Sequence, residues 1–394
     1  MMKTLNRRPM SQTETNSGMN CWLDAWHVNP SVNRDYDFID GLRGIAILMV
    51  VCCHILYINP KSGPVTQFLG ALCGAGAGGV VLFFAISGFL ISWPFWKRKF
   101  AGGEQVVPRG YGWRRFWKIY PPLALSIVVL TPVYVFLNHD WSYIPIAAKW
   151  LAGIPFLWPV SGKLNSVMWT LAIEVQFYMV LPLVFLMLKK VPPKVCLWVI
   201  PLIFLLVPVA FRACTGFSAG ITPEINTHFP SALDAFCLGT LIAGLDNQGA
   251  LGRRWALLGT AGVFLWPLAL LLIAWTGTHP GLQGSALDKS LPWIEKIASG
   301  CLLCYVANQK HPVAHFLCSP WLRWCGIISY EWYLFHQPIV LWARTIIGPA
   351  GGNVALYAAI VGGSILLSGI LSALVFRRFS LPILKYGRAG FGRG

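Results

Sequence analysis

Charged side chains are scarce in this chain, and acidic ones are the scarcest. Only 11% of the 394 residues are charged and only 14 are Asp or Glu, whereas a soluble domain is typically about 25% charged. This shortage excludes an ordinary soluble domain. Hydrophobic residues make up 56% of the chain, and many apolar runs reach the roughly 17–25 residues that a membrane-spanning helix needs. We therefore predict an all-α, polytopic integral membrane protein.

Three further patterns are missing. The chain lacks the alternating segments of about ten residues that are typical of membrane β-barrels, so a barrel is excluded. It shows no repeat between its halves, which weakens an inverted-repeat transporter. Cys301 and Cys304 form a CxxC pair, but no second pair or histidine cluster accompanies them at zinc spacing. We therefore predict no metal site and no permanently bound cofactor.

Basic residues outnumber acidic ones, 31 to 14, but their placement argues against nucleic acid as a partner. They lie mostly in short loops between apolar runs, where the positive-inside rule explains them. One alternating set of segments carries 23 of the 31, which predicts that both termini are cytoplasmic. The ten predicted spans are residues 42–60, 72–94, 119–137, 166–188, 195–211, 230–246, 255–275, 291–308, 324–346 and 354–376.

The spans divide the chain into a cytoplasmic N-terminal tail (1–37), one membrane domain (38–388) and a short C-terminal tail (389–394). Within the first tail, residues 21–28 either lie at the membrane interface or are disordered. The connection 138–165 is long, apolar and rich in Pro and Trp. We expect it to dip into the bilayer, which is allowed where protein buries the backbone.

The first predicted span carries two ionisable residues, Arg43 and His54. Eleven residues at about 100° each bring them to one helix face, about 16 Å apart along the axis. An ionisable group inside a membrane is costly and indicates function by default. The alternatives are an interface anchor for Arg43 and an interhelical hydrogen bond for His54.

Polar residues also follow one face of the fourth predicted span. Thr170, Glu174 and Tyr178 recur at four-residue spacing, so they share a face. The alternative role for Glu174 is a structural ion pair. In the ninth span, Tyr333 and His336 share a face with Ser329, and packing with a hydrogen bond is the alternative for His336.

A basic cluster stands at the entry to the third span. Arg114, Arg115 and Lys118 occupy adjoining helical turns on the predicted cytoplasmic side. Three fixed cations there could hold a phosphorylated ligand. Ordinary positive-inside charge is the alternative.

Five stretches in order resemble the membrane acyltransferase-3 family, over about residues 36–388. They are DGLRGIAILMVVCCH, FFAISGFLI, RRFWKIYP, WTLAIEVQFY and ISYEWYLFH. The resemblance implies transfer of an acyl group, often acetyl, from cytoplasmic acyl-CoA to a hydroxyl of a carbohydrate or other small acceptor. It also implies a stand-alone transferase in the bacterial cytoplasmic (inner) membrane, without the esterase-like domain that many members append.

The resemblance implies that Arg43 and His54 are the essential pair, with Glu174 as a supporting catalytic residue. It assigns the donor to the basic cluster, where Lys118 stands in place of a more usual arginine. The full set of candidate substrate-binding residues is Ser87, Arg114, Arg115, Lys118, Gln176, Tyr178, Tyr330, Tyr333 and His336.

The chemistry fits these residues without the family. An alcohol that attacks a thioester needs a base near neutral pKa, and histidine suits that role. The spacing of Arg43 and His54 would then separate the phosphate end of coenzyme A from its reacting end. Two alternatives stay open: a proton-coupled transporter with a His54–Glu174–His336 relay, and a non-enzymatic lipid-binding or assembly protein. The sequence identifies neither the acceptor nor the oligomeric state.

Overall fold

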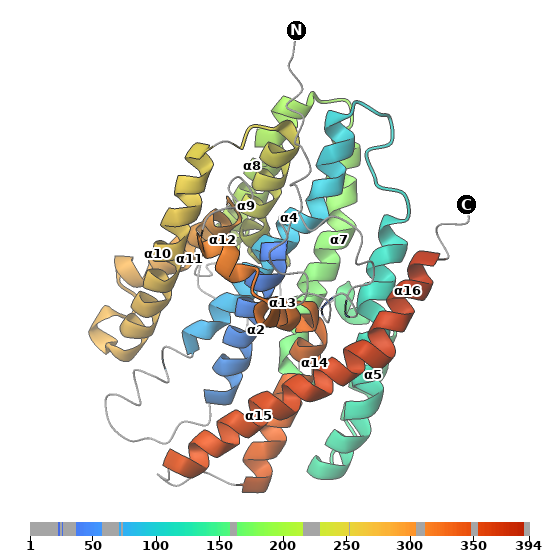
Figure 1. Cartoon of the computed structure of the whole chain (residues 1–394), viewed down its shortest axis with the longest axis vertical. Coiled ribbons are helices and arrows are strands. Elements are labelled where there is room, and N and C mark those ends of the chain that lie inside the picture. The colour runs from blue at the N-terminus through green and yellow to red at the C-terminus, as the bar shows by residue number, and fades with distance from the viewer. Residues whose placement is uncertain are drawn as a thin grey trace, which may run out of the picture.

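The computed structural model describes residues 23, 26, 37–56, 71, 74–157, 164–215, 229–251, 253–304, 312–347 and 354–389. Every regular element among these residues is helical, which confirms the predicted helical bundle (Figure 1). The principal helices are α2 (Asp37–Leu56), α4 (Gly78–Phe100), α5 (Tyr111–Asn138), α7 (Trp169–Met187), α8 (Pro193–Thr215), α9 (Phe229–Gln248), α10 (Arg253–Thr278), α11 (Ala286–Leu302), α14 (Ser329–Ile347) and α15 (Val354–Val375).

Each of the ten predicted spans overlaps one of these helices, and the parts at 57–60, 72–73 and 305–308 lie outside the described residues. By length and composition, seven described stretches are long and apolar enough to cross a membrane: Ala75–Phe100, Tyr111–Asn138, Ser166–Met187, Pro193–Cys214, Phe229–Gln248, Leu257–Thr278 and Ala359–Gly387. The other three predicted spans correspond to α2, α11 and α14, which carry charged residues along their length. A total of ten spans and the side on which the termini lie stay predictions.

Helices α4 and α9 form the centre of the bundle. In their most apolar windows 78% of α4 and 72% of α9 is buried, against 33% for α8 and α10. The two central helices cross at glycines, which allow their backbones to touch. A Cβ at Gly88 would collide with the Phe236 carbonyl, and one at Gly239 with the Ala85 carbonyl. Such close approach of small residues is how membrane helices associate.

Helix α2 is held between α4 and the short helix α13 (Pro320–Ile327). A Cβ at Gly79 would collide with the Ala46 carbonyl, and one at Gly326 with the Asp40 carbonyl. The α2 backbone is therefore in direct contact with two neighbours, which fixes where its polar residues point.

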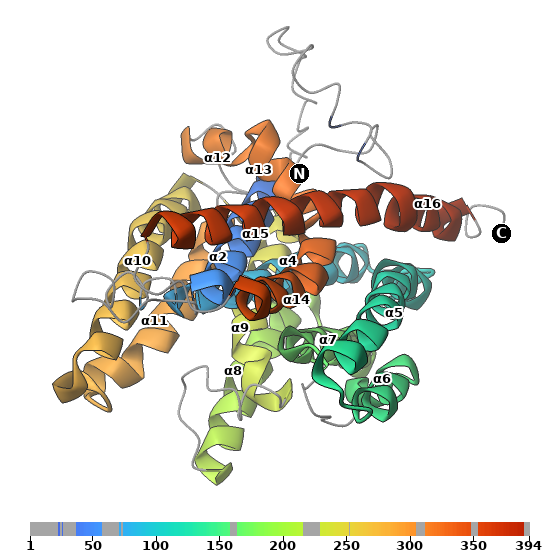
Figure 2. The same ribbon diagram turned by 90° about the horizontal axis from the view of Figure 1, so that it is seen from below.

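The connection after α5 folds back along that helix. It contains α6 (Tyr143–Leu151) and the short helices η3 (Ile154–Phe156) and η4 (Ser166–Met168). Tyr143 stacks on Tyr134 with ring centroids 5.3 Å apart, and the Tyr120 hydroxyl donates to the Leu151 carbonyl at 2.7 Å. Figure 2 shows α6 beside α5 and α7. This packing gives the apolar connection a protein surface to bury against.

Helix α15 continues through the π-helical turn η7 (Phe376–Ser380) into α16 (Leu381–Ala389). The three form one long rod that crosses the bundle and ends beside α5 (Figure 1). There the Trp113 indole donates to the Gly387 carbonyl at 3.0 Å. Of the predicted interface segment 21–28, only Leu23 and Trp26 are described, and Trp26 stacks on Phe376 at 6.2 Å.

Candidate active site

Two cavities meet inside the bundle. The basic cavity lies between α2, α5, α14 and the η7–α16 end of the rod. The inner cavity lies between α2, α4, α5, α7 and α14. Four residues line both cavities and are called the neck here: Arg43, Arg115, Lys118 and Tyr330.

Cations outnumber carboxylates around the basic cavity. Its lining includes Arg114 and the three cations of the neck, against two carboxylates, Asp40 and Glu331. The cavity therefore favours an anionic ligand.

The contacts of the neck cations leave donors available. Arg43 donates to the Ser329 hydroxyl at 2.9 Å and lies 3.7 Å from Asp40. The Arg115 guanidinium lies 5.3 Å from the centre of the Tyr178 ring, and its buried Nε finds no hydrogen-bond partner in the described part of the chain. A buried donor without a partner is costly unless a ligand supplies an acceptor.

One carboxylate dominates the inner cavity. Glu174 Oε1 accepts hydrogen bonds from the Ser87 hydroxyl at 2.8 Å and the Tyr178 hydroxyl at 2.6 Å. Tyr111 in turn donates to the Tyr178 carbonyl at 3.1 Å. These contacts tie α4 and α5 to α7 and hold Glu174 at the cavity wall. No hydrogen bond joins Glu174 to His54, both of which are described.

Tyrosines from α14 close the inner cavity. The Tyr333 hydroxyl lies 2.6 Å from the Thr170 hydroxyl and 2.8 Å from the Val167 carbonyl. The Tyr330 hydroxyl donates to the Ile119 carbonyl at 2.8 Å. Both rings are therefore fixed by hydrogen bonds to neighbouring helices, so their positions are set before any ligand enters.

A pair of histidines lies beyond Tyr333. His54 from α2 and His336 from α14 stand with ring centroids 5.0 Å apart, and His336 Nε2 is 3.2 Å from His54 Nδ1. His336 is fully buried, whereas His54 is half-buried. Neither histidine lines the two cavities, but the Tyr333 ring centroid is 5.9 Å from that of His336. The pair thus stands next to the inner cavity.

Most of the sequence candidates meet in this one place. Those that line the basic cavity, the inner cavity or both are Arg43, Ser87, Arg114, Arg115, Lys118, Glu174, Tyr178, Tyr330 and Tyr333. Gln176 lines neither cavity. The sequence analysis did not predict a role for Tyr111. Its ring lies 5.7 Å from the Arg115 guanidinium, and its position one helical turn before Arg115 could have indicated this contact.

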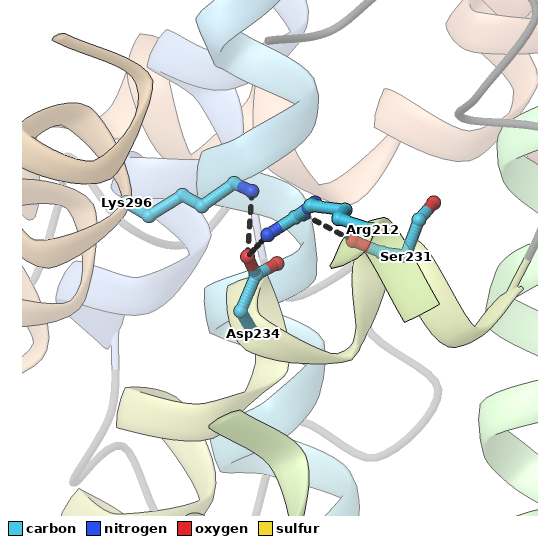
Figure 3. Close-up of polar contacts among 4 residues, drawn as sticks. All are labelled: Arg212, Ser231, Asp234 and Lys296. Atoms are coloured by element: carbon cyan, nitrogen blue, oxygen red, sulfur yellow. Dashed lines mark hydrogen bonds and ion pairs between the residues drawn. The ribbon is translucent and has the colours of Figure 1, made fainter. Parts of the chain in front are cut away.

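A second polar cluster lies away from the cavities, between α8, α9 and α11 (Figure 3). The Oδ2 atom of Asp234 is 2.8 Å from both Arg212 Nη1 and Lys296 Nζ. Arg212 also donates to the Ser231 carbonyl, and both cations lie against the Trp293 ring, at 5.0 and 5.3 Å from its centre. Here the charges are buried against one another rather than aimed at open space.

No group of three or more His, Cys, Asp or Glu side chains that could hold a metal gathers among the residues that the structure describes.

The family model described as "Acyltransferase domain" matches residues 36–373. The O-acetyltransferase OatA of Staphylococcus aureus is 24% identical over 391 residues, covering 90% of this chain and 58% of that protein. The peptidoglycan O-acetyltransferase OatA of Listeria monocytogenes is 26% identical, covering 90% of this chain and 57% of that protein.

A third relative, the acyltransferase MdmB of Streptomyces mycarofaciens, is 23% identical, covering 86% of this chain and 87% of that protein. The chain thus spans less than two thirds of the two OatA proteins and most of MdmB. No solved structure matches the chain.

Proposed function

Because the chain belongs to the acyltransferase domain family whose model matches residues 36–373, we propose that it transfers an acyl group to a hydroxyl. The donor is a cytoplasmic acyl-CoA, with acetyl as the expected group, and the acceptor is a carbohydrate or other small molecule. Two relatives are named O-acetyltransferases, one of them for peptidoglycan, which supports a sugar hydroxyl as the acceptor. The enzyme works in the membrane, and we assign it to the bacterial cytoplasmic membrane.

The single observation that carries this proposal is the neck. Coenzyme A has a phosphate-rich end and a long pantetheine arm that ends in the thioester. The cation-lined cavity suits the phosphates, since Arg pairs with phosphate through two parallel hydrogen bonds. The inner cavity, reached between Arg43, Arg115 and Lys118, suits the arm and the acyl group.

Transfer requires one proton acceptor beside the thioester. The acceptor hydroxyl oxygen attacks the carbonyl carbon, its proton passes to His54, the C–S bond breaks and the coenzyme A thiolate leaves. Arg43 supports this step by holding the donor in the neck. Glu174 supports it by fixing Ser87 and Tyr178 at the wall of the inner cavity.

The test is turnover of labelled acetyl-CoA by purified protein with a panel of hydroxyl acceptors. Replacing His54 by Asn keeps a polar side chain that cannot take a proton near neutral pH. We expect it to lower turnover by about 100-fold or more, since general-base catalysis contributes roughly 10²–10⁴. Binding of acetyl-CoA should persist.

The matched control is His279→Asn, because His279 is exposed, its Nδ1 lies 2.8 Å from the Trp275 carbonyl, and it lines neither cavity. It should leave turnover unchanged. If His54→Asn keeps more than about a tenth of the wild-type rate, His54 is a structural residue and not the base.

The transporter alternative gains no support from the relatives, whose names are those of acyltransferases. It predicts uptake of the acceptor into sealed vesicles in the absence of any acyl donor. The acyltransferase proposal predicts no such flux.

A further inference from the structure

His336 makes three polar contacts through its two ring nitrogens. Its Nδ1 lies 3.0 Å from the Trp332 carbonyl and 2.9 Å from the Tyr333 carbonyl. Its Nε2 lies 3.2 Å from Nδ1 of His54. The ring is 0% exposed, and no carboxylate is in hydrogen-bond contact with it among the described residues.

These contacts decide the tautomer of His336. Both neighbours of Nδ1 are carbonyl oxygens, which only accept, so Nδ1 carries the ring proton. Full burial disfavours a second proton. The Nε2 atom of His336 is therefore a hydrogen-bond acceptor.

The tautomer of His54 follows. Its Nδ1 faces two acceptors, His336 Nε2 at 3.2 Å and the Val50 carbonyl at 2.9 Å. Nδ1 of His54 must carry the proton, because otherwise two lone pairs would face each other at each contact. The free lone pair of the neutral His54 ring is consequently on Nε2.

We propose that His336 is a positioning residue for the acyl transfer, which together with the Val50 carbonyl holds His54 in the tautomer whose Nε2 takes the proton of the acceptor hydroxyl. The proposal rests on the function proposed above. It assigns His336 a role distinct from binding the substrate and from serving as the base itself.

The same geometry also suits the imidazolium that proton transfer forms on His54. When Nε2 takes the hydroxyl proton, His54 becomes an imidazolium whose Nδ1–H still points at His336 Nε2. A neutral imidazole thus performs the orienting task that a carboxylate performs in Ser-His-Asp sites. It does so without placing a buried negative charge next to the base, which suits a membrane interior.

The experiment compares two substitutions in the full chain. His336→Leu keeps an apolar volume but removes the acceptor, and His336→Gln keeps an acceptor near the position of Nε2. We expect His336→Leu to lower kcat on the order of 10- to 100-fold with the KM for acetyl-CoA unchanged, because orientation and not donor binding is lost. His336→Gln should recover most of the lost kcat.

A second measurement needs no variant of His336. Nitrogen NMR of histidine-labelled wild-type protein distinguishes a protonated Nδ1 from a protonated Nε2, and the His54→Asn variant identifies the His54 signal. We expect the Nδ1–H tautomer for His54, and an Nε2–H tautomer would overturn the proposal even if His336→Leu fails to fold.

Equal kcat for His336→Leu and wild type would also overturn it, as would equal losses for His336→Leu and His336→Gln, which indicate a packing role. These results differ from failure of the proposed function, in which the wild-type protein transfers no acyl group to any acceptor of the panel.

Discussion

Two groups of basic side chains lie inside this bundle, and they differ in what faces them. In the neck, Arg43, Arg115 and Lys118 border open space on two sides. In the second cluster, Arg212 and Lys296 both lie 2.8 Å from one oxygen of Asp234, and both are about nine-tenths buried. The first group borders open cavities, whereas the second group is paired with a carboxylate on a neighbouring helix.

The difference shows that a cation within a membrane helix has two distinct uses. A buried cation with a carboxylate partner fixes the contact between helices. Removing the partner leaves the cation buried without a counter-charge. A cation beside a cavity is available to an anionic ligand, and we expect its removal to affect binding more than folding. Stability and donor affinity should therefore respond to different substitutions.

The largest effect is expected in the second cluster. Asp234→Asn keeps the shape of the side chain but leaves Arg212 and Lys296 without a counter-charge, which typically costs about 3–5 kcal/mol. We expect a large fall in the unfolding temperature of the protein in detergent, with donor affinity of the folded fraction unchanged. The control is Glu104→Gln, because Glu104 is exposed in the α4–α5 loop. If Asp234→Asn kept the wild-type unfolding temperature but lost acetyl-CoA binding, the distinction between a structural cluster and a ligand-binding neck would be wrong.

The next effect is expected at the neck and the basic cavity. Arg115→Ala and Arg114→Ala should each weaken acetyl-CoA binding by about 1.5–3 kcal/mol, the worth of a charge-assisted hydrogen bond. Arg115 should show the greater loss, because its buried Nε has no hydrogen-bond partner among the residues that the structure describes. Calorimetric titration measures the change, and Arg98→Ala is the control, since the Arg98 guanidinium donates to the nearby Gln105 carbonyl and lines neither cavity. Unchanged affinity in both variants would contradict the donor assignment.

The smallest effect concerns salt. The Debye length falls from roughly 10 Å at 0.1 M to 3 Å at 1 M, and buried pairs are screened much less than open charges. Donor affinity should therefore fall with rising ionic strength, while the unfolding temperature changes little. Parallel loss of both over the same salt series would show that the two groups of cations are equally open to solvent.

Hydropathy was sufficient to find the ten principal helices, because a membrane span must satisfy its own backbone and present apolar side chains. It was insufficient for their ends. Helix α5 begins at Tyr111, eight residues before the predicted span, since Arg114, Arg115 and Lys118 continue the helix beyond the apolar part. Helix α4 likewise continues to Phe100 through Pro94 and three basic residues. Polar helical turns give no hydropathy signal.

Helical periodicity predicted which residues of one helix share a face. It did not predict which residues of different helices are in contact. It aligned Glu174 with Tyr178, which the structure joins by a hydrogen bond. It also contained a signal that was not used: Gln176 is two residues, about 200°, from Glu174 and so faces away from the cavity.

Contacts between helices were beyond the sequence, because they depend on the rotation and depth of each helix. The partnership of Ser87 with Glu174 requires α4 and α7 to face each other, and that of His54 with His336 requires α2 and α14 to be level. Asp234 had no predicted role, since its partners Arg212 and Lys296 come from α8 and α11.

The neck has a kinetic consequence under the proposed donor assignment. Its cations hold the phosphate end of coenzyme A, which is the same before and after the acyl group leaves. Each contact that tightens acyl-CoA therefore tightens free coenzyme A equally, and such uniform binding lowers KM without raising kcat. Spent coenzyme A becomes a competitive product inhibitor with respect to acyl-CoA, and its departure through the same passage sets an upper limit on turnover. Tighter phosphate binding at Arg43, Arg115 and Lys118 would thus give an enzyme that free coenzyme A inhibits more strongly.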